Sequence, residues 1–126
     1  MIIKGGLIMI LLTMIFLHIV DDYVLQGILA QLKQKKFWED NAPDEMYKYD
    51  YIWALIMHSF SWTFMIMLPI ALIQKVGNPF YAVFLANIFV HAITDDAKAN
   101  RHKINLWQDQ IVHIVQIVLT FHILGG

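Results

Sequence analysis

The sequence predicts an all-α integral membrane protein: a four-helix bundle with up-down-up-down topology and a charged first loop. Two features of the composition indicate this fold class. Hydrophobic residues make up 59% of the 126 residues and the mean hydropathy is +0.56, while only 15% of the residues are charged, which leaves too little polar surface for an ordinary soluble domain. The third indication is that the apolar residues fall into four long segments.

The whole chain, residues 1–126, is expected to form a single transmembrane domain. A segment such as 51–73 is long enough to cross a hydrocarbon core of about 30 Å at about 1.5 Å per residue. The first segment, from Gly5, could also be a cleavable signal peptide, but Asp21 and Asp22 stand where a small-residue cleavage site is needed. The predicted helices cover residues of about 5–32, 51–73, 80–99 and 104–124.

Three connections separate these helices. Residues 33–50 are rich in charge, which predicts a solvated loop with room for a short surface helix. Residues 74–79 contain Gly77 and Pro79, a glycine stop followed by a proline suited to the first turn of the next helix. Residues 100–105 form a short basic connector.

The basic residues favour one orientation in the membrane, because lysine and arginine are retained on the cytoplasmic side. Seven lie in or beside the first and third connections, whereas the other side has only Lys4 and Lys75. We therefore expect both termini on the outer side. The seven are Lys33, Lys35, Lys36, Lys48, Lys98, Arg101 and Lys103.

Ionisable residues inside the predicted helices are the clearest functional signal, because each costs about 2.5–3.5 kcal/mol on insertion scales and needs a partner. Three helices carry a histidine and an aspartate four residues apart, which places both on one helix face. In an up-down-up-down bundle all of these positions fall in the same half of the membrane. The sequence therefore predicts one polar cluster, open toward the cytoplasm, made of His18 and Asp22, His58, His91 and Asp95, and Asp109 and His113.

These residue types suggest a metal site. Neutral imidazoles and carboxylates suit zinc, iron or manganese, and a divalent cation would compensate the buried acids. We expect a divalent transition metal, zinc before iron or manganese, with Asp95 or Asp109 as general base and Lys98 as a group that holds a phosphate or an oxyanion. The candidate ligands are His18, Asp22, His58, His91, Asp95, Asp109 and His113.

Each candidate also has a purely structural interpretation. The histidine–aspartate pairs could form an interhelical hydrogen-bond network without metal. His58 could be a hydrogen-bonded core histidine, and Lys98 an interfacial lysine that snorkels to the membrane surface. Interfacial or surface positions are expected for Asp21, Asp96, His102 and His122.

Four motifs in order, over nearly the whole chain, resemble the small bacterial and phage membrane proteins grouped as domain of unknown function 3307. The resemblance implies the bacterial inner membrane but little biochemistry. Asp21 stands where that family usually has a small or apolar residue, so the choice between Asp21 and Asp22 stays open. A looser similarity, to YdjM-like inner-membrane proteins described as metal-dependent hydrolases, is an analogy only. The motifs are His18-x-x-x-Asp22-x-x-x-Gln26, His58, His91-x-x-x-Asp95-x-x-Lys98 and Asp109-Gln110-x-x-His113.

We expect a metal-dependent hydrolase that acts on a lipid or an amphiphilic ester or phosphoester at the cytoplasmic face. The alternative is a non-enzymatic membrane protein whose cluster binds or conducts an ion or proton, or fixes helix register. A phage lysis or exclusion factor would need no such cluster. Membrane lipids are the expected partners, homo-oligomerisation is left open, and a net charge of −1 without a basic face gives no reason to expect nucleic acid.

Overall fold

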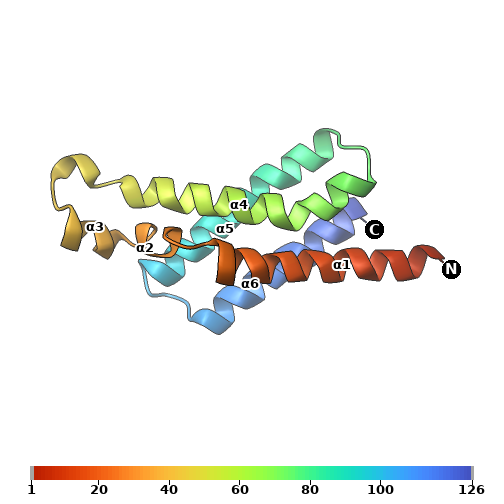
Figure 1. Ribbon diagram of the computed structural model, residues 1–126, viewed down its shortest axis with the longest axis horizontal. Coiled ribbons are helices and arrows are strands. Elements are labelled where there is room, and N and C mark those ends of the chain that lie inside the picture. The colour runs from red at the N-terminus through yellow and green to blue at the C-terminus, as the bar shows by residue number, and fades with distance from the viewer. Residues whose placement is uncertain (1, 126) are drawn as a thin grey trace.

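The computed structural model describes residues 2–125 and shows an all-α protein, as predicted. Within this range the chain forms six α-helices and no β-strand. Figure 1 shows that each long helix runs antiparallel to the next and that both ends of the chain lie at the same end of the molecule. The four long helices are α1 (Ile2–Val20), α4 (Asp50–Ile73), α5 (Asn78–Ala99) and α6 (Leu106–Thr120).

The first long helix differs from its prediction. The sequence predicts one helix over residues 5–32, whereas α1 ends at Val20 and passes into a wide π-turn, Asp21–Leu25. Gly27 then adopts a φ of 52°, a left-handed conformation that glycine reaches readily. The chain changes direction there and enters the short α2 (Leu29–Leu32).

The charged segment after α2 contains the short helix expected for it. This helix, α3 (Lys35–Asn41), and a 3-10 turn (Glu45–Tyr47) lie beyond the ends of the long helices (Figure 1). Trp38 stacks on Tyr47 with ring centroids 6.3 Å apart. Its Nε1–H also donates a hydrogen bond of 2.7 Å to the carbonyl oxygen of Leu32, which ties α3 to α2.

Local signals explain where α5 and α6 begin. Gly77 precedes α5, and Pro79 lies in its first turn, where a missing N–H leaves no helical hydrogen bond unmade. Asn105 and Gln108 form a reciprocal capping box at the start of α6, with side chain–backbone hydrogen bonds of 2.9 and 3.0 Å. The helix predicted over 104–124 therefore consists of α6 and a final π-turn, Phe121–Gly125.

The interior of the bundle divides into an apolar half and a polar half. Close packing of the side chains in the apolar half holds the helices together around the polar half. Its fully buried residues lie toward the end that carries the termini and are Met14, Trp62, Ile66, Met67, Ile70 and Ile117.

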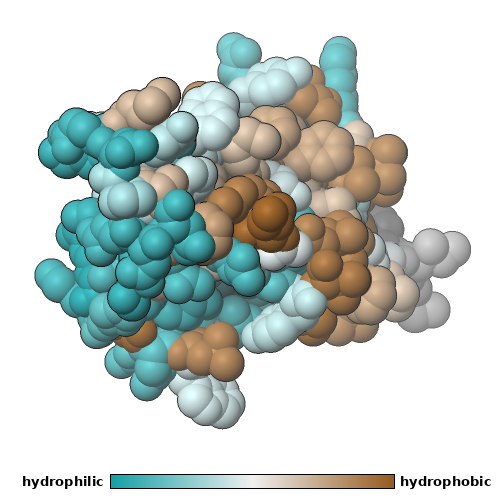
Figure 2. All heavy atoms as spheres, turned by 60° about the vertical axis from the view of Figure 1, so that its left-hand side comes forward, coloured by the Kyte–Doolittle hydropathy of each residue, from teal (hydrophilic) through white to brown (hydrophobic). Residues whose placement is uncertain are grey.

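Much of the outer surface of the long helices is apolar. Two segments, Gly5–Leu25 and Glu45–Ile73, are long and apolar enough to cross a membrane. Figure 2 shows hydrophilic residues gathered at the end that carries α3, with hydrophobic residues behind them. The exposed apolar side chains include Ile8, Leu12, Phe16, Trp53, Phe60, Leu85, Phe89, Ile111 and Val115.

Candidate metal centre

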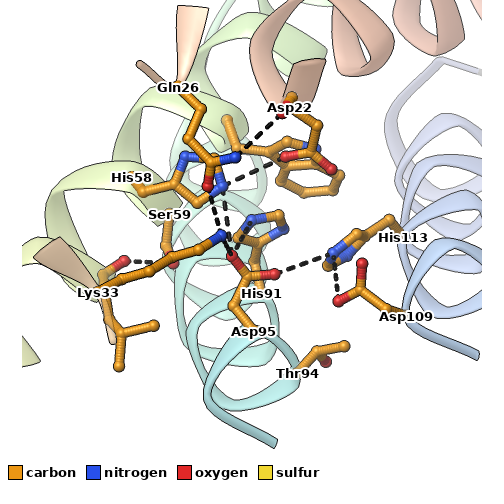
Figure 3. Close-up of polar contacts among 12 residues, drawn as sticks. Asp22, Gln26, Lys33, His58, Ser59, His91, Thr94, Asp95, Asp109 and His113 are labelled. Atoms are coloured by element: carbon orange, nitrogen blue, oxygen red, sulfur yellow. Dashed lines mark hydrogen bonds and ion pairs between the residues drawn. The ribbon is translucent and has the colours of Figure 1, made fainter. Parts of the chain in front are cut away.

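All four long helices contribute to one buried polar cluster, together with the π-turn and the residue after α2. His91, Asp109 and His113 are fully buried, and the other members have relative exposures of 5% or less, except Asp22, whose side chain is 10% exposed. The residues expected to converge are thus brought together (Figure 3). The polar cluster consists of His18, Asp21, Asp22, Lys33, His58, His91, Asp95, Asp109 and His113.

Asp95 of α5 lies at the centre of the polar cluster, between imidazoles of two other helices (Figure 3). Its Oδ1 is 3.3 Å from Nε2 of His113 on α6. Its Oδ2 is 3.3 Å from Nε2 of His58 on α4 and 3.7 Å from Nε2 of His91. The two oxygens of one carboxylate therefore face two different histidines.

The protonation of His113 follows from its hydrogen bonds. The amide nitrogen of Gln116 donates to both oxygens of Asn87, at 3.1 and 3.2 Å, so Gln116 Oε1 must accept from His113 Nδ1, 3.1 Å away. In a neutral ring the lone pair of Nε2 then faces Asp95 Oδ1 and Asp109 Oδ1, each at 3.3 Å. Three acceptor atoms at this separation need a cation between them, either a proton or a metal ion.

Carboxylate oxygens also surround the ring of His58. Its Nδ1 is 3.7 Å from Asp21 Oδ2, and its Nε2 is 3.2 Å from Asp22 Oδ1 as well as close to Asp95. None of these contacts has hydrogen-bond geometry, so both ring nitrogens lack a hydrogen bond among residues 2–125. Leaving a buried polar group unpaired costs about 1–3 kcal/mol, which indicates a cation at the ring, either a proton or a metal ion.

His91 is held in place by aromatic stacking and not by hydrogen bonds. It stacks between Trp62, at 4.2 Å, and His113, at 4.1 Å between ring centroids. Neither of its nitrogens has a hydrogen-bond partner in the described part of the chain. Stacking therefore fixes the ring and leaves its nitrogens available to a cation.

The donor set fits a divalent transition metal. Two groups of residues offer ligand atoms that all lie within 4.8 Å of one another: Asp22 with His58 and His91, and His91 with Asp95 and His113. Nitrogen from imidazole and oxygen from carboxylate are suitable ligands for zinc, iron and manganese. The unpaired buried nitrogens show that these residues have unused capacity to bind a cation.

His18, one of the expected ligands, differs from the other histidines of the polar cluster in its hydrogen bonds. Trp62 Nε1–H donates a hydrogen bond of 2.8 Å to its Nδ1, and its Nε2 lies 3.0 Å from Gln110 Oε1. Both ring nitrogens are therefore engaged, and His18 belongs to neither group of potential ligands. Its nitrogens are therefore less available to a cation than those of His58 and His91.

Asp21 was expected at the membrane interface, and the structure shows instead that it is buried. Ser61 donates a hydrogen bond of 2.6 Å to its Oδ1, and its Oδ2 faces His58. The correction has a local cause, because Asp21 begins the π-turn and is directed at α4. Both members of the Asp21–Asp22 pair thus contact His58, one on each ring nitrogen.

Lys33 was expected in a solvated loop, and this too is corrected, because its side chain is buried. Its Nζ lies 2.7 Å from Asp95 Oδ2 and also donates to Gln26. The change of direction at Gly27 brings this lysine back to the bundle. The sequence offered one signal for it: Gln26 and Gly27 lie between Asp22 and Lys33.

The remaining candidates lie at the border of the polar cluster. Lys98 is half-buried and donates a hydrogen bond of 2.9 Å to Asp109 Oδ2, so it contacts a cluster acid rather than only solvent. Gln110 donates to the same oxygen at 3.0 Å and to Asp22 at 3.4 Å.

Three residues that were expected at interfacial or surface positions lie outside the polar cluster. Asp96 pairs with Arg101, and His102 and His122 are exposed.

Comparison with known proteins adds no identification. No protein-family model, curated protein or solved structure matches the chain. The resemblance drawn from the four motifs therefore stays a prediction.

Proposed function

We propose that this protein is a membrane-embedded, metal-dependent hydrolase that acts on a lipid or an amphiphilic ester or phosphoester at the cytoplasmic face. One observation carries the proposal. His58 and His91, from two different helices, are buried with unpaired ring nitrogens beside Asp22 and Asp95, among the residues that the structure describes. A buried histidine pair of this kind is satisfied by a cation that both rings and the adjacent acids can bind.

The surface supports a location in a membrane. Large apolar side chains are exposed along the outward faces of the long helices, and water would not favour so large an exposed apolar area. The hydrophilic end carries most of the basic residues outside the polar cluster (Figure 2). We place this end in the cytoplasm of a bacterial cell, and the basic residues still favour that side with the buried Lys33 left out.

Charge supports a divalent cation. Four aspartates of the polar cluster face two lysines, so two further positive charges are needed, which protonated imidazoles or a divalent cation would supply. Uncompensated charge in a site of low dielectric is strongly unfavourable. One divalent cation restores neutrality. The position with the most unpaired donor atoms is that of His58, His91 and Asp22, with Asp95 Oδ2 beside it.

The neighbouring residues fit hydrolysis. A bound divalent cation supplies a nucleophile from water at neutral pH and polarises an oxygen of the scissile bond. Asp109, beside His113, takes the proton from water. The oxygen of water bonds to the acyl carbon or phosphorus, the bond to the alcohol oxygen breaks, and the proton passes to that oxygen. Lys98, held by Asp109, lies where it can bind the developing negative charge.

The apolar half of the bundle supports a closed site over an ion pathway. A conduction path requires polar groups that continue to the far side of the membrane. Beyond the polar cluster the buried polar side chains of the described chain are uncharged, namely Thr63, Asn87, Gln116 and Thr120, and the apolar core includes Met14, Ile66 and Ile70. No buried ionisable side chain of the described chain continues the cluster toward the far side, which favours a closed site.

The proposal is tested with detergent-purified protein reconstituted in vesicles. Hydrolysis of p-nitrophenyl acyl esters and phosphoesters of increasing chain length is measured before and after chelation and after addition of zinc, manganese or iron. We expect hydrolysis that is lost on chelation, restored by one metal and abolished by His91→Gln, but kept in the matched control His122→Gln. Hydrolysis that survives both chelation and His91→Gln would contradict the proposal, as would a protein that binds metal and cleaves none of these substrates.

A further inference from the structure

We propose that the site holds two divalent cations, bridged by the carboxylate of Asp95. This inference rests on the proposed function, because it sets the number of cations in the same site. Its basis is that the polar cluster contains two positions at which one imidazole nitrogen and two carboxylate oxygens face one another (Figure 3). Asp95 is the only residue common to both sets of three atoms.

The two positions have the same composition. At the first, His58 Nε2 lies 3.2 Å from Asp22 Oδ1 and 3.3 Å from Asp95 Oδ2. At the second, His113 Nε2 lies 3.3 Å from Asp109 Oδ1 and 3.3 Å from Asp95 Oδ1. Each position thus has one imidazole, one terminal carboxylate and one oxygen of a shared carboxylate. A carboxylate that directs its two oxygens at two such positions is suited to bridging two cations.

Each of these two imidazoles also has an oxygen atom beside its other ring nitrogen, Nδ1. Asp21 Oδ2 lies beside the Nδ1 of His58, and Gln116 Oε1 lies beside the Nδ1 of His113. At His113 this hydrogen bond fixes the tautomer that leaves Nε2 free to bind a metal. At His58 the Asp21 carboxylate lies 3.7 Å away without a hydrogen bond and favours the same tautomer through its charge.

Unpaired atoms remain at both positions. Asp22 Oδ1 and His58 Nε2 at the first, and Asp109 Oδ1 at the second, are buried without a hydrogen bond within residues 2–125. His91 lies between them, with its ring centroid 5.0 Å from that of His58 and 4.1 Å from that of His113. It belongs to both groups of potential ligands, so a nitrogen donor is available to complete either position.

A second cation also specifies the substrate. One divalent cation neutralises the polar cluster, and a second gives it an excess of two positive charges, which suits an anionic phosphoester and not a neutral acyl ester. Two cations a few ångströms apart stabilise both the attacking and the leaving oxygen of phosphoryl transfer. Water then adds its oxygen to phosphorus, the P–O bond to the alcohol breaks, and one proton of water ends on the alcohol. Asp109 acts as a ligand in this arrangement instead of as the proton acceptor.

Metal stoichiometry tests the inference. Detergent-purified protein is loaded with manganese, freed of excess metal by gel filtration and analysed for metal per chain. We expect about two ions in the natural protein and in the control His122→Gln, and about one in Asp22→Asn and in Asp109→Asn. One ion in the natural protein that is retained in Asp109→Asn would overturn the two-cation site and leave the proposed function standing. No bound ion would overturn both.

Electron paramagnetic resonance of the manganese-loaded protein keeps the test decisive if a variant fails to fold. Two ions bridged by one carboxylate give the multiline spectrum of an exchange-coupled pair. We expect that spectrum from the natural protein. The six-line spectrum of isolated ions at full loading would overturn the inference without the use of any variant.

Discussion

The Nζ of Lys33 lies 2.7 Å from Oδ2 of Asp95, although 62 residues separate them in the sequence. Two further hydrogen bonds hold the same part of the chain: Asn100 Nδ2 donates to the carbonyl oxygen of Lys33 at 3.0 Å, and the N–H of Lys35 donates to Asn100 Oδ1 at 2.6 Å. The segment after α1 is thereby fixed to the end of α5. It closes the polar cluster on the hydrophilic side.

Substitution of Lys33 should make the fold depend on metal. Removing one partner of a buried ion pair costs about 3–5 kcal/mol, because the other charge is left uncompensated. In Lys33→Met a bound cation would compensate Asp95 and would no longer be repelled by the ammonium group. We therefore expect a lower Tm without metal and a larger rise in Tm on adding zinc than in the natural protein. Tryptophan fluorescence during heating in detergent measures both.

The matched control for this substitution is Lys35→Met, because Lys35 is an exposed residue two positions further on. It should leave the Tm and its response to zinc nearly unchanged. If Lys33→Met behaved like Lys35→Met, the buried ion pair would not contribute as the structure indicates.

Gly27 should tolerate alanine poorly. At a φ of 52° an L-residue costs about 1–2 kcal/mol more than glycine, and the change would also shift α2 and Lys33. Gly5→Ala, on α1 with open space around the added methyl group, should instead be neutral or stabilise by about 0.5–1 kcal/mol. The free energy of unfolding from denaturing-detergent titrations compares the two. Equal effects of the two substitutions would argue against the turn.

The hydrogen bonds of His18 lead to a prediction about metal content. Because both of its nitrogens are engaged by Trp62 and Gln110, His18→Gln should keep the bound metal, with affinity reduced by about tenfold at most, the lower end of effects outside the ligands themselves. His91→Gln should reduce the affinity for the metal much more. Competition with a chromophoric chelator measures the affinities, and equal losses in the two variants would restore His18 as a ligand.

Asp21 should matter through His58 and not through direct binding. Asp21→Asn can still accept the hydrogen bond from Ser61 but removes the charge beside the ring. Loss of such an orienting carboxylate weakens metal binding by about 10–100-fold. The same competition assay applies, with Asp96→Asn as control because Asp96 pairs with Arg101 outside the polar cluster. A weakening that is as large in the control would contradict this role.

The sequence was sufficient to predict the all-α class and the meeting of polar residues from four helices. Both depend on helical periodicity: a spacing of four residues puts Asp95 and His91 on one face, and alternating helix directions bring that face to the level of His58 and His113. Periodicity needs no knowledge of side-chain packing. It is therefore readable from one sequence.

The parts that the sequence could not supply depend on departures from regular helix. Lys33 and Asp21 reach the polar cluster only because a π-turn and Gly27 replace the helix predicted over 5–32. The role of His18 depends on the indole N–H of Trp62, and a tryptophan in an apolar segment is ordinarily a packing residue. Such contacts depend on the tertiary structure, and no regular spacing of residues in the sequence indicates them.

The most direct test of the central claim is a crystal structure of the protein grown with zinc or manganese, with anomalous diffraction data collected on both sides of the metal's absorption edge. We expect anomalous density inside the bundle, within bonding distance of His58 or His91 and of Asp95. Crystals at full metal concentration with no anomalous density there would contradict it. The polar cluster would then be a proton-satisfied network that joins the helices.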